Sequence, residues 1–192
     1  MNIHQLSVRY LPEQDRILLS VNTTDDQAFD LWLTRRICLA LLPQLKRMVV
    51  DHFAAPAASQ GDGFVDLTAL DANARKVLTD FRGQEWLQNA DFKTPYRATA
   101  GTHPLGNMPL LATEITMKPG TDQQVSIHFQ EQLNPNGASR AVQMSLHTPL
   151  VFSLMHMLGQ ALEHTQWLSP VDTADLPRVP SLTDQDRPRY LN

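Results

Sequence analysis

One pattern constrains the fold of this chain more than any other: three strand-like runs followed by a helix-like run occur twice in its 192 residues. In each strand-like run apolar and polar residues alternate, as they do in strands with one buried face. The apolar positions of the first set are Leu6, Val8 and Tyr10; Ile17, Leu19 and Val21; and Phe29, Leu31 and Leu33. Thr34 is suited to cap a helix, whose apolar face would be Ile37, Leu41, Leu45, Met48 and Val49. We therefore predict a β-β-β-α unit over residues 3–53.

The same order of runs returns about 110 positions later. Its apolar positions are Ile115 and Met117; Val125, Ile127 and Phe129; Val142, Met144 and Leu146; and, on the helix, Leu150, Leu154, Leu158, Ala161 and Leu162. We expect Thr148 to cap this helix, with Pro149 in its first turn. The shift between the runs is 107 positions in the first strand (Val8 to Ile115), 108 in the second and 113 from the third onward. We predict a second β-β-β-α unit over residues 112–168 and interpret the pair as an internal duplication.

The segment between the two units has a different composition. Residues 54–63 are rich in Ala, Gly and Ser, which is typical of a linker. Residues 71–89 have the pattern of a helix that Gly83 should break or bend. We expect this helix to bury Val77, Leu78, Phe81 and Leu87. Residues 94–109 contain three prolines and two glycines, which indicates a long ordered loop.

These elements together predict an α+β fold. A unit of about fifty residues rarely forms a stable core alone, so we expect a single pseudo-symmetric domain over residues 1–168 rather than two independent ones. In it a helical insertion, residues 54–111, joins the two tandem units. Residues 169–192 contain four prolines and few large apolar side chains, and we expect a flexible tail there.

Composition narrows the setting in which such a chain would act. A formal net charge of −4 gives no strong global attraction to nucleic acid or acidic lipid. The single cysteine, Cys38, excludes an intramolecular disulfide and a thiolate-rich zinc site. The first residues lack the basic start and apolar run of a signal peptide, and the apolar stretch 149–162 is too short to span a bilayer. We expect a cytoplasmic protein that is not bound to a membrane.

The residues that could support catalysis form no known motif. The phosphate-binding, dinucleotide-binding, zinc-protease, serine-hydrolase and Cys-x-x-Cys signatures are all missing from the sequence. His128 should lie opposite Gln143 in a hairpin, and so apart from His147, while His156 and His164 are separated by two helical turns. We therefore predict no catalytic residue, metal ligand or cofactor site. The alternative is an enzyme with an unrecognised site, in which a deep polar pocket would gather several of His103, His128, His147, His156, Asp62 and Asp66.

A second alternative is binding of single-stranded DNA or RNA. Duplicated units of antiparallel strands followed by a helix resemble, in architecture, the whirly-type and PUR-type single-strand binders, whose units have four strands rather than three. Such binding needs a basic groove and aromatic platforms, for which the candidates are Trp32, Arg9, Arg35 and Arg36. The outward strand positions carry about as many acidic as basic residues, so we do not expect nucleic acid as the partner.

The distribution of charge favours a protein partner instead. Residues 112–168 carry six charged residues, whereas residues 3–53 carry twelve. Depletion of charge together with Met and aromatic residues is typical of an interface core, although burial of the second helix between the two units would explain the same composition. The candidate interface residues are Phe152, Met155, Met157, His128 and His147. We expect a non-catalytic interaction, adaptor or accessory-subunit protein that forms a homo-oligomer or binds a protein partner.

Overall fold

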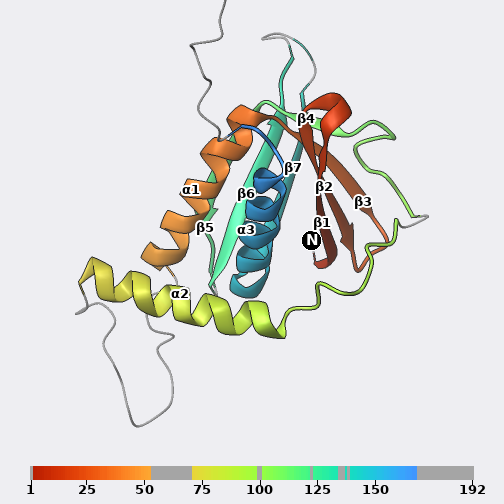
Figure 1. Cartoon of the computed structure of the whole chain (residues 1–192). Coiled ribbons are helices and arrows are strands. Elements are labelled where there is room, and N and C mark those ends of the chain that lie inside the picture. The colour runs from red at the N-terminus through yellow and green to blue at the C-terminus, as the bar shows by residue number, and fades with distance from the viewer. Residues whose placement is uncertain are drawn as a thin grey trace, which may run out of the picture.

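The structure, a computed structural model, describes residues 2–52, 71–98, 101–121, 123–133, 137 and 139–167. In these residues the chain forms a four-stranded sheet, a three-stranded sheet and three α-helices (Figure 1). The first sheet contains β1 (Ile3–Leu11), β2 (Arg16–Thr23), β3 (Ala28–Leu33) and β4 (Leu110–Ala112), and the second contains β5 (Glu114–Pro119), β6 (Gln124–Glu131) and β7 (Arg140–His147). The helices are α1 (Arg35–His52), α2 (Ala72–Asn89) and α3 (Thr148–Glu163). None of these helices is long and apolar enough to cross a membrane.

The predicted α+β fold of two β-β-β-α units is confirmed. Strands β1, β2 and β3 precede α1, and strands β5, β6 and β7 precede α3. Within each unit neighbouring strands pair antiparallel. The helix predicted in the insertion is α2. The predicted linker, residues 54–63, and the predicted tail, residues 169–192, lie outside the described residues.

Strand pairing agrees with two of the three predicted shifts between the units. Strands β2 and β6 have the same length and start 108 positions apart. The pairs Leu19 with Leu31 and Ile127 with Met144 reproduce the shift of 113 in the third strand. In the first strand, however, Leu6 pairs with Val21 and Ile115 pairs with Phe129, which gives a shift of 109 instead of 107. A slip of two residues keeps every side chain on its face of the sheet, so alternation alone could not detect it.

The N-termini of helices α1 and α3 are capped differently. Helix α1 follows Thr34, whose Oγ1 accepts a hydrogen bond from the Ile37 N–H at 3.4 Å, as predicted for a cap. At α3 the predicted cap is wrong: the N-cap residue is His147, which makes no side-chain capping bond. The Thr148 hydroxyl instead donates to the Gln123 carbonyl at 2.9 Å, and so ties the start of α3 to the turn before β6. Pro149 lies in the first turn of α3, as predicted.

The two sheets are joined at one short stretch of chain. Strand β4 pairs in parallel with β3, and only Thr113 separates it from β5, which pairs with β6. The Thr113 N–H donates to the Gln130 carbonyl at 2.9 Å, while the Leu111 N–H donates to the Glu131 carboxylate at 3.0 Å. Glu131 also forms an ion pair with Arg140 at 2.5 Å. The strand therefore changes sheets at Thr113, and the Glu131 carboxylate holds the change in place.

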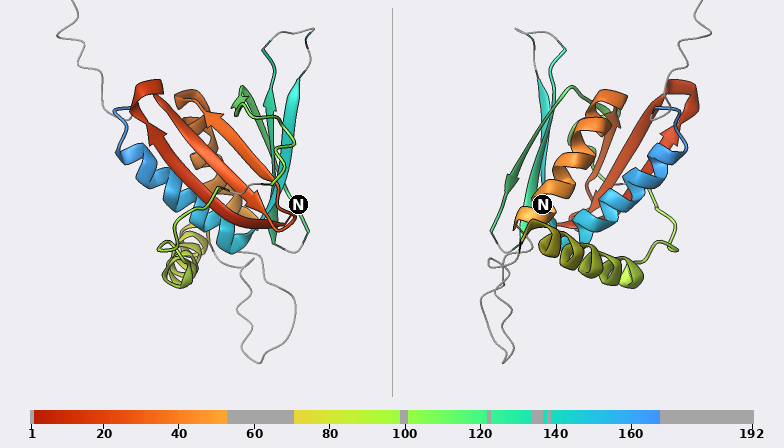
Figure 2. Two further views of the ribbon diagram at one scale, coloured as in Figure 1. Left: turned by 90° about the vertical axis from the view of Figure 1, so that its right-hand side faces the viewer. Right: turned by 60° about the vertical axis from the view of Figure 1, so that its left-hand side comes forward.

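Helices α1 and α3 lie side by side, and each contacts the first strand of the other unit. Helix α1 contacts α3 and β5, and α3 contacts β1 as well as β6 and β7 (Figure 2). One contiguous hydrophobic core contains buried residues from both sheets and from both helices. The core is therefore shared between the two units.

Helix α2 crosses the ends of α1 and α3 (Figure 1), and its orientation corrects two predictions. Val77 and Phe81, expected in the core, are 69% and 66% exposed, whereas Thr79 and Gly83 are buried. The helix runs through Gly83 without a break. A Cβ at this glycine would collide with Cε1 of Phe152, whose ring centroid is 5.2 Å from that of Trp86. Gly83 therefore permits the close approach of α2 to α3.

The chain after α2 runs along the outer face of the first sheet. We call residues 90–98 and 101–103 the strap. Asn22 of β2 donates from Nδ2 to the Arg97 carbonyl at 2.6 Å and accepts at Oδ1 from the Tyr96 hydroxyl at 2.7 Å. The Ala28 N–H of β3 donates to the Thr102 carbonyl at 2.9 Å. The described part of the predicted loop 94–109 is thus ordered by bonds to β2 and β3.

Two glycine substitutions with opposite expected effects test the α2 contact. Gly83→Ala should lower the free energy of unfolding by about 1 kcal/mol, because the strain of overpacking exceeds the gain in helix propensity. Gly159→Ala in α3 is the control, because a Cβ there meets no atom within 4 Å. It should raise the free energy of unfolding by about 0.5–1 kcal/mol. Denaturant titration measures both values, and a stabilising Gly83→Ala would contradict the packing described.

A second substitution tests the junction between the sheets. Hydrogen bonds from Arg140 lower the pKa of the Glu131 carboxyl below its usual value. The stabilisation is therefore present above the pKa of the unfolded carboxyl and is lost as the pH falls through the lowered folded value. Glu131→Gln should lower the free energy of unfolding at pH 7 by about 1–2 kcal/mol, and the difference from the wild type should shrink below pH 4. Glu114→Gln, at an exposed position on β5, should change little at either pH.

Candidate functional site

Strand β1 has one open edge. In the described residues it pairs with β2 alone. No residue of β1 is fully buried, although Leu6, Val8 and Tyr10 pack against the core. An edge strand presents a row of backbone N–H and C=O groups that have no partner in the sheet. The open edge of β1 can therefore accept a further strand.

Helix α3 forms the opposite wall of a groove beside β1. The groove has two parts that share Met157, and they follow β1 in succession. The wide part, about 1060 Å³, lies along His4, Gln5 and Leu6. The narrow part, about 550 Å³, lies along Val8, Arg9 and Tyr10. The two cavities follow one another along β1, an arrangement that suits an extended chain better than a compact small molecule.

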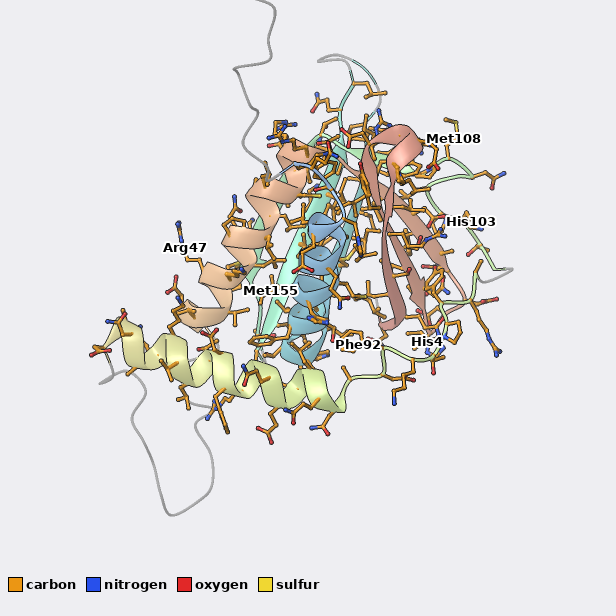
Figure 3. All side chains as sticks on the ribbon, viewed as in Figure 1. His4, Arg47, Phe92, His103, Met108 and Met155 are labelled. Carbon is orange, nitrogen blue, oxygen red and sulfur yellow. The ribbon has the colours of Figure 1, made fainter. Side chains whose placement is uncertain are left out.

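The wide part has a mixed lining, in which large apolar side chains stand among polar and charged ones. Leu6 contributes from β1, Leu150 from α3 and Trp86 from the end of α2. Phe92 of the strap is 44% exposed and lies against His156 of α3 in a tilted arrangement, with ring centroids 5.2 Å apart. Figure 3 shows Phe92 and His4 beyond the end of α2. This part can hold a large apolar side chain.

The narrow part ends at an aromatic corner. The Tyr10 and Trp167 rings meet edge to face, with centroids 5.8 Å apart. Both side chains donate to Oδ1 of Asp15, Tyr10 at 3.0 Å and Trp167 at 2.6 Å. Desolvation, and then the Asp15 carboxylate, raise the pKa of the Tyr10 hydroxyl, so it remains a neutral donor. Arg9 and His164 line this part, and the Asp15 carboxylate lies beside it through its hydrogen bond with Tyr10.

A separate polar cavity lies between the strap and the outer face of the first sheet. It has a volume of about 470 Å³ and includes Ser20, Asp30, Tyr96 and His103. The Ser20 hydroxyl donates to Asp30 at 2.5 Å. Burial raises the pKa of Tyr96 to about 12. The enzyme hypothesis would gather His103, His128, His147 and His156 in one pocket. Only His103 lines this cavity, and none of the four lines the other described cavities.

The candidate interface residues do not form one surface. Phe152 is 6% exposed and packs on α2, so it serves packing within the chain. Met155 is half-buried against the core, while Met157 lines both parts of the groove. His128 and His147 lie on the outer face of the second sheet, away from α3. As predicted, His128 pairs with Gln143, and His147 pairs with Gln124.

The candidate nucleic-acid contacts are also separated. The Arg35 guanidinium donates to the Trp167 carbonyl at 2.8 Å, and that of Arg36 donates to the Thr113 carbonyl at 2.6 Å. Trp32 and Arg9 lie in one row across the outer face of the first sheet, with Leu18 between them. The row provides one aromatic platform and one cation, and that cation also lines the polar cavity with Asp30 and Tyr96.

Cys38 lies in the core, where its thiol is shielded from water. Cys38 is fully buried, and desolvation raises its pKa to about 12. In the part of the chain that the structure describes, no group of three or more His, Cys, Asp or Glu residues could hold a metal ion. Cys38 therefore behaves as a small core residue, the interpretation that a helix position next to Ile37 favours.

Sequence reasoning missed most of the groove. Leu6 and Val8 were predicted as strand residues, but alternation says nothing about which strand lies at a sheet edge. Phe92 and Trp86 come from the insertion, whose contacts with α3 have no local signal. Comparisons with protein-family models, with curated proteins and with solved structures found no match to this chain.

The burial of Cys38 makes its reactivity a test of the fold. With a pKa of about 12 the thiol is neutral at pH 8, so a disulfide reagent should modify native protein at least about a hundredfold more slowly than unfolded protein. Because the chain has one cysteine, absorbance of the released thiolate reports this position alone. A rate in buffer equal to the rate in denaturant would contradict the buried position.

Proposed function

We propose that this protein is a non-catalytic interaction module that binds an extended segment of a partner polypeptide along β1. One observation carries the proposal: an open strand edge lies beside a groove whose other wall is a helix. An extended segment added to such an edge gains main-chain hydrogen bonds, and the groove can select its side chains. Binding of this kind needs no catalytic residue or cofactor.

The composition of the groove supports this proposal. Its wide part offers Leu6, Trp86 and Leu150 to an apolar side chain. Met157, midway along the groove, is flexible and can adapt to different side chains. Leu6 and Val8 are half-buried, so a bound strand would remove more of their surface from water.

Two further statements are part of the proposal. We place the protein in the cytoplasm, because its only cysteine is a buried free thiol and it has no disulfide to maintain. We attribute the two units to an internal duplication, which is supported by the common length of β2 and β6 and by the shift of 113 in the third strand.

A random peptide library displayed on phage and selected on the full chain tests the binding function. Enriched sequences are made as synthetic peptides, and their affinity is measured by fluorescence anisotropy. Met157→Glu should weaken binding at least about tenfold, because it places a charge in the groove. The control, Val77→Glu on the exposed face of α2, should change binding less than about twofold.

The role of the strand edge has its own measurement. Successive N–H groups of an added strand point alternately toward and away from β1. N-methylation of the peptide residues whose N–H groups point toward β1 should therefore abolish binding. N-methylation of the alternate residues, whose N–H groups point away, should leave binding intact. Hydrogen exchange of the β1 amides should slow when peptide is added. No enrichment, or binding that is indifferent to both Met157→Glu and N-methylation, would overturn the proposed function.

A further inference from the structure

The polar cavity between the strap and the outer face of the first sheet has the size and the chemistry of a site for a small molecule. Its volume of about 470 Å³ is within the range of cavities that hold small ligands. We propose that it binds an aminocarboxylate, a molecule with one carboxylate and one protonated amine, with the carboxylate at Arg9 and the amine at Asp30. This inference goes beyond the proposed function, because it concerns the face of the sheet rather than the open edge of β1.

Two adjacent rows of the sheet form the floor of the cavity. Ser7, Ser20 and Asp30 pair across β1, β2 and β3, so they stand in one row. Arg9 and Leu18 pair in the next row. All of them line the cavity, and in each strand they alternate with residues that belong to the hydrophobic core or pack against it. Because neighbouring strands are about 4.8 Å apart and residues along a strand about 3.3 Å apart, the Cα atoms of Arg9 and Asp30 are about 12 Å apart, at opposite corners of the floor.

The two charged side chains of the floor do not neutralise each other by direct contact. In the described residues Arg9 and Asp30 form no ion pair. Oδ1 of Asp30 accepts a hydrogen bond from the Ser20 hydroxyl at 2.5 Å, and Oδ2 accepts none from the described residues. Arg9 is exposed and also borders the narrow part of the groove, so its guanidinium can turn toward a ligand. A cation and an anion are therefore both available to a bound molecule.

The strap forms the roof of the cavity with Tyr96, Ala98 and His103. The Tyr96 hydroxyl donates to Oδ1 of Asn22 at 2.7 Å, which holds it over β2. Burial, and then the Asp30 carboxylate, raise the pKa of Tyr96 to about 12, whereas the Arg9 guanidinium opposes the rise. The hydroxyl is therefore neutral at pH 7, and both charged groups lie near enough to act on it. A ligand beneath this hydroxyl would meet a cation on one side and an anion on the other.

A molecule with both charges complements this cavity better than a molecule with one. An Arg guanidinium binds a carboxylate with two parallel hydrogen bonds, and a protonated amine offers three donors to a carboxylate such as that of Asp30. A simple carboxylate would bring a second anion near Asp30, and a simple amine would bring a second cation near Arg9. Like charges at close range weaken binding, so either simple molecule should bind more weakly than the aminocarboxylate.

Nuclear magnetic resonance of the full-length protein tests the proposal. The probes are glycine, 4-aminobutyrate and 6-aminohexanoate, because the distance between their charged groups increases in that order. Each is compared with the simple carboxylate and the simple amine that have the same number of carbon atoms. At least one aminocarboxylate should shift the side-chain amide signal of Asn22 with a dissociation constant below about 10 mM, and its two matched compounds should bind at least about tenfold more weakly. The proposal is overturned if none of the three binds, or if a matched compound binds as tightly as the aminocarboxylate.

Two substitutions separate the roles of the charged side chains. With Arg9→Gln the aminocarboxylate should bind at least about tenfold more weakly and should lose its preference over the matched amine. With Asp30→Asn its affinity should fall in the same way, and its preference over the matched carboxylate should disappear. The control, Lys118→Gln at an exposed position on β5, should retain the wild-type affinity. Wild-type affinity and selectivity in either cavity variant would contradict the role assigned to that side chain, and the comparison of ligands on the wild type decides the proposal even if a variant fails to fold.

Discussion

The ion pair between Arg140 and Glu131 holds the junction at which the chain passes from one sheet to the other. The Glu131 carboxylate also accepts the Leu111 N–H, and the Arg140 guanidinium donates to the carbonyls of Leu105, Met108 and Pro109. This pair of side chains therefore connects the start of β7 in the second sheet to the residues that lead into β4 of the first sheet. Because the pair is partly shielded from water, its hydrogen bonds are stronger than those of an exposed pair.

The junction sets the positions of the helices, and the helices create the groove. With the sheets joined between β4 and β5, α1 reaches β5 and α3 reaches β1. This exchange closes a common core, and it also leaves α3 alongside a strand edge that no other described strand occupies. The surface proposed for binding is thus a product of the same packing that stabilises the fold.

The mistaken predictions have a common physical cause. Val77 and Phe81 are apolar residues of α2, and local reasoning places them inside, but they are 69% and 66% exposed. The contact with α3 instead requires that the Phe152 ring approach the helix backbone, which only Gly83 allows. The hydroxyl of Thr148 was expected to cap its own helix, but it bonds to Gln123, 25 residues earlier. In each case a distant partner competes with a local preference and prevails.

The sequence by itself determined the elements and the faces that they bury. Alternation in the strands and helical spacing in α1 and α3 identify core residues such as Leu19, Ile127 and Leu154, because burial of apolar surface acts on each element locally. It also placed His128 opposite Gln143. Only the tertiary structure decided which strand forms an edge, which helix lies beside it and which face of α2 is buried. Those outcomes depend on contacts between residues far apart in the chain, and no periodicity within one segment records them.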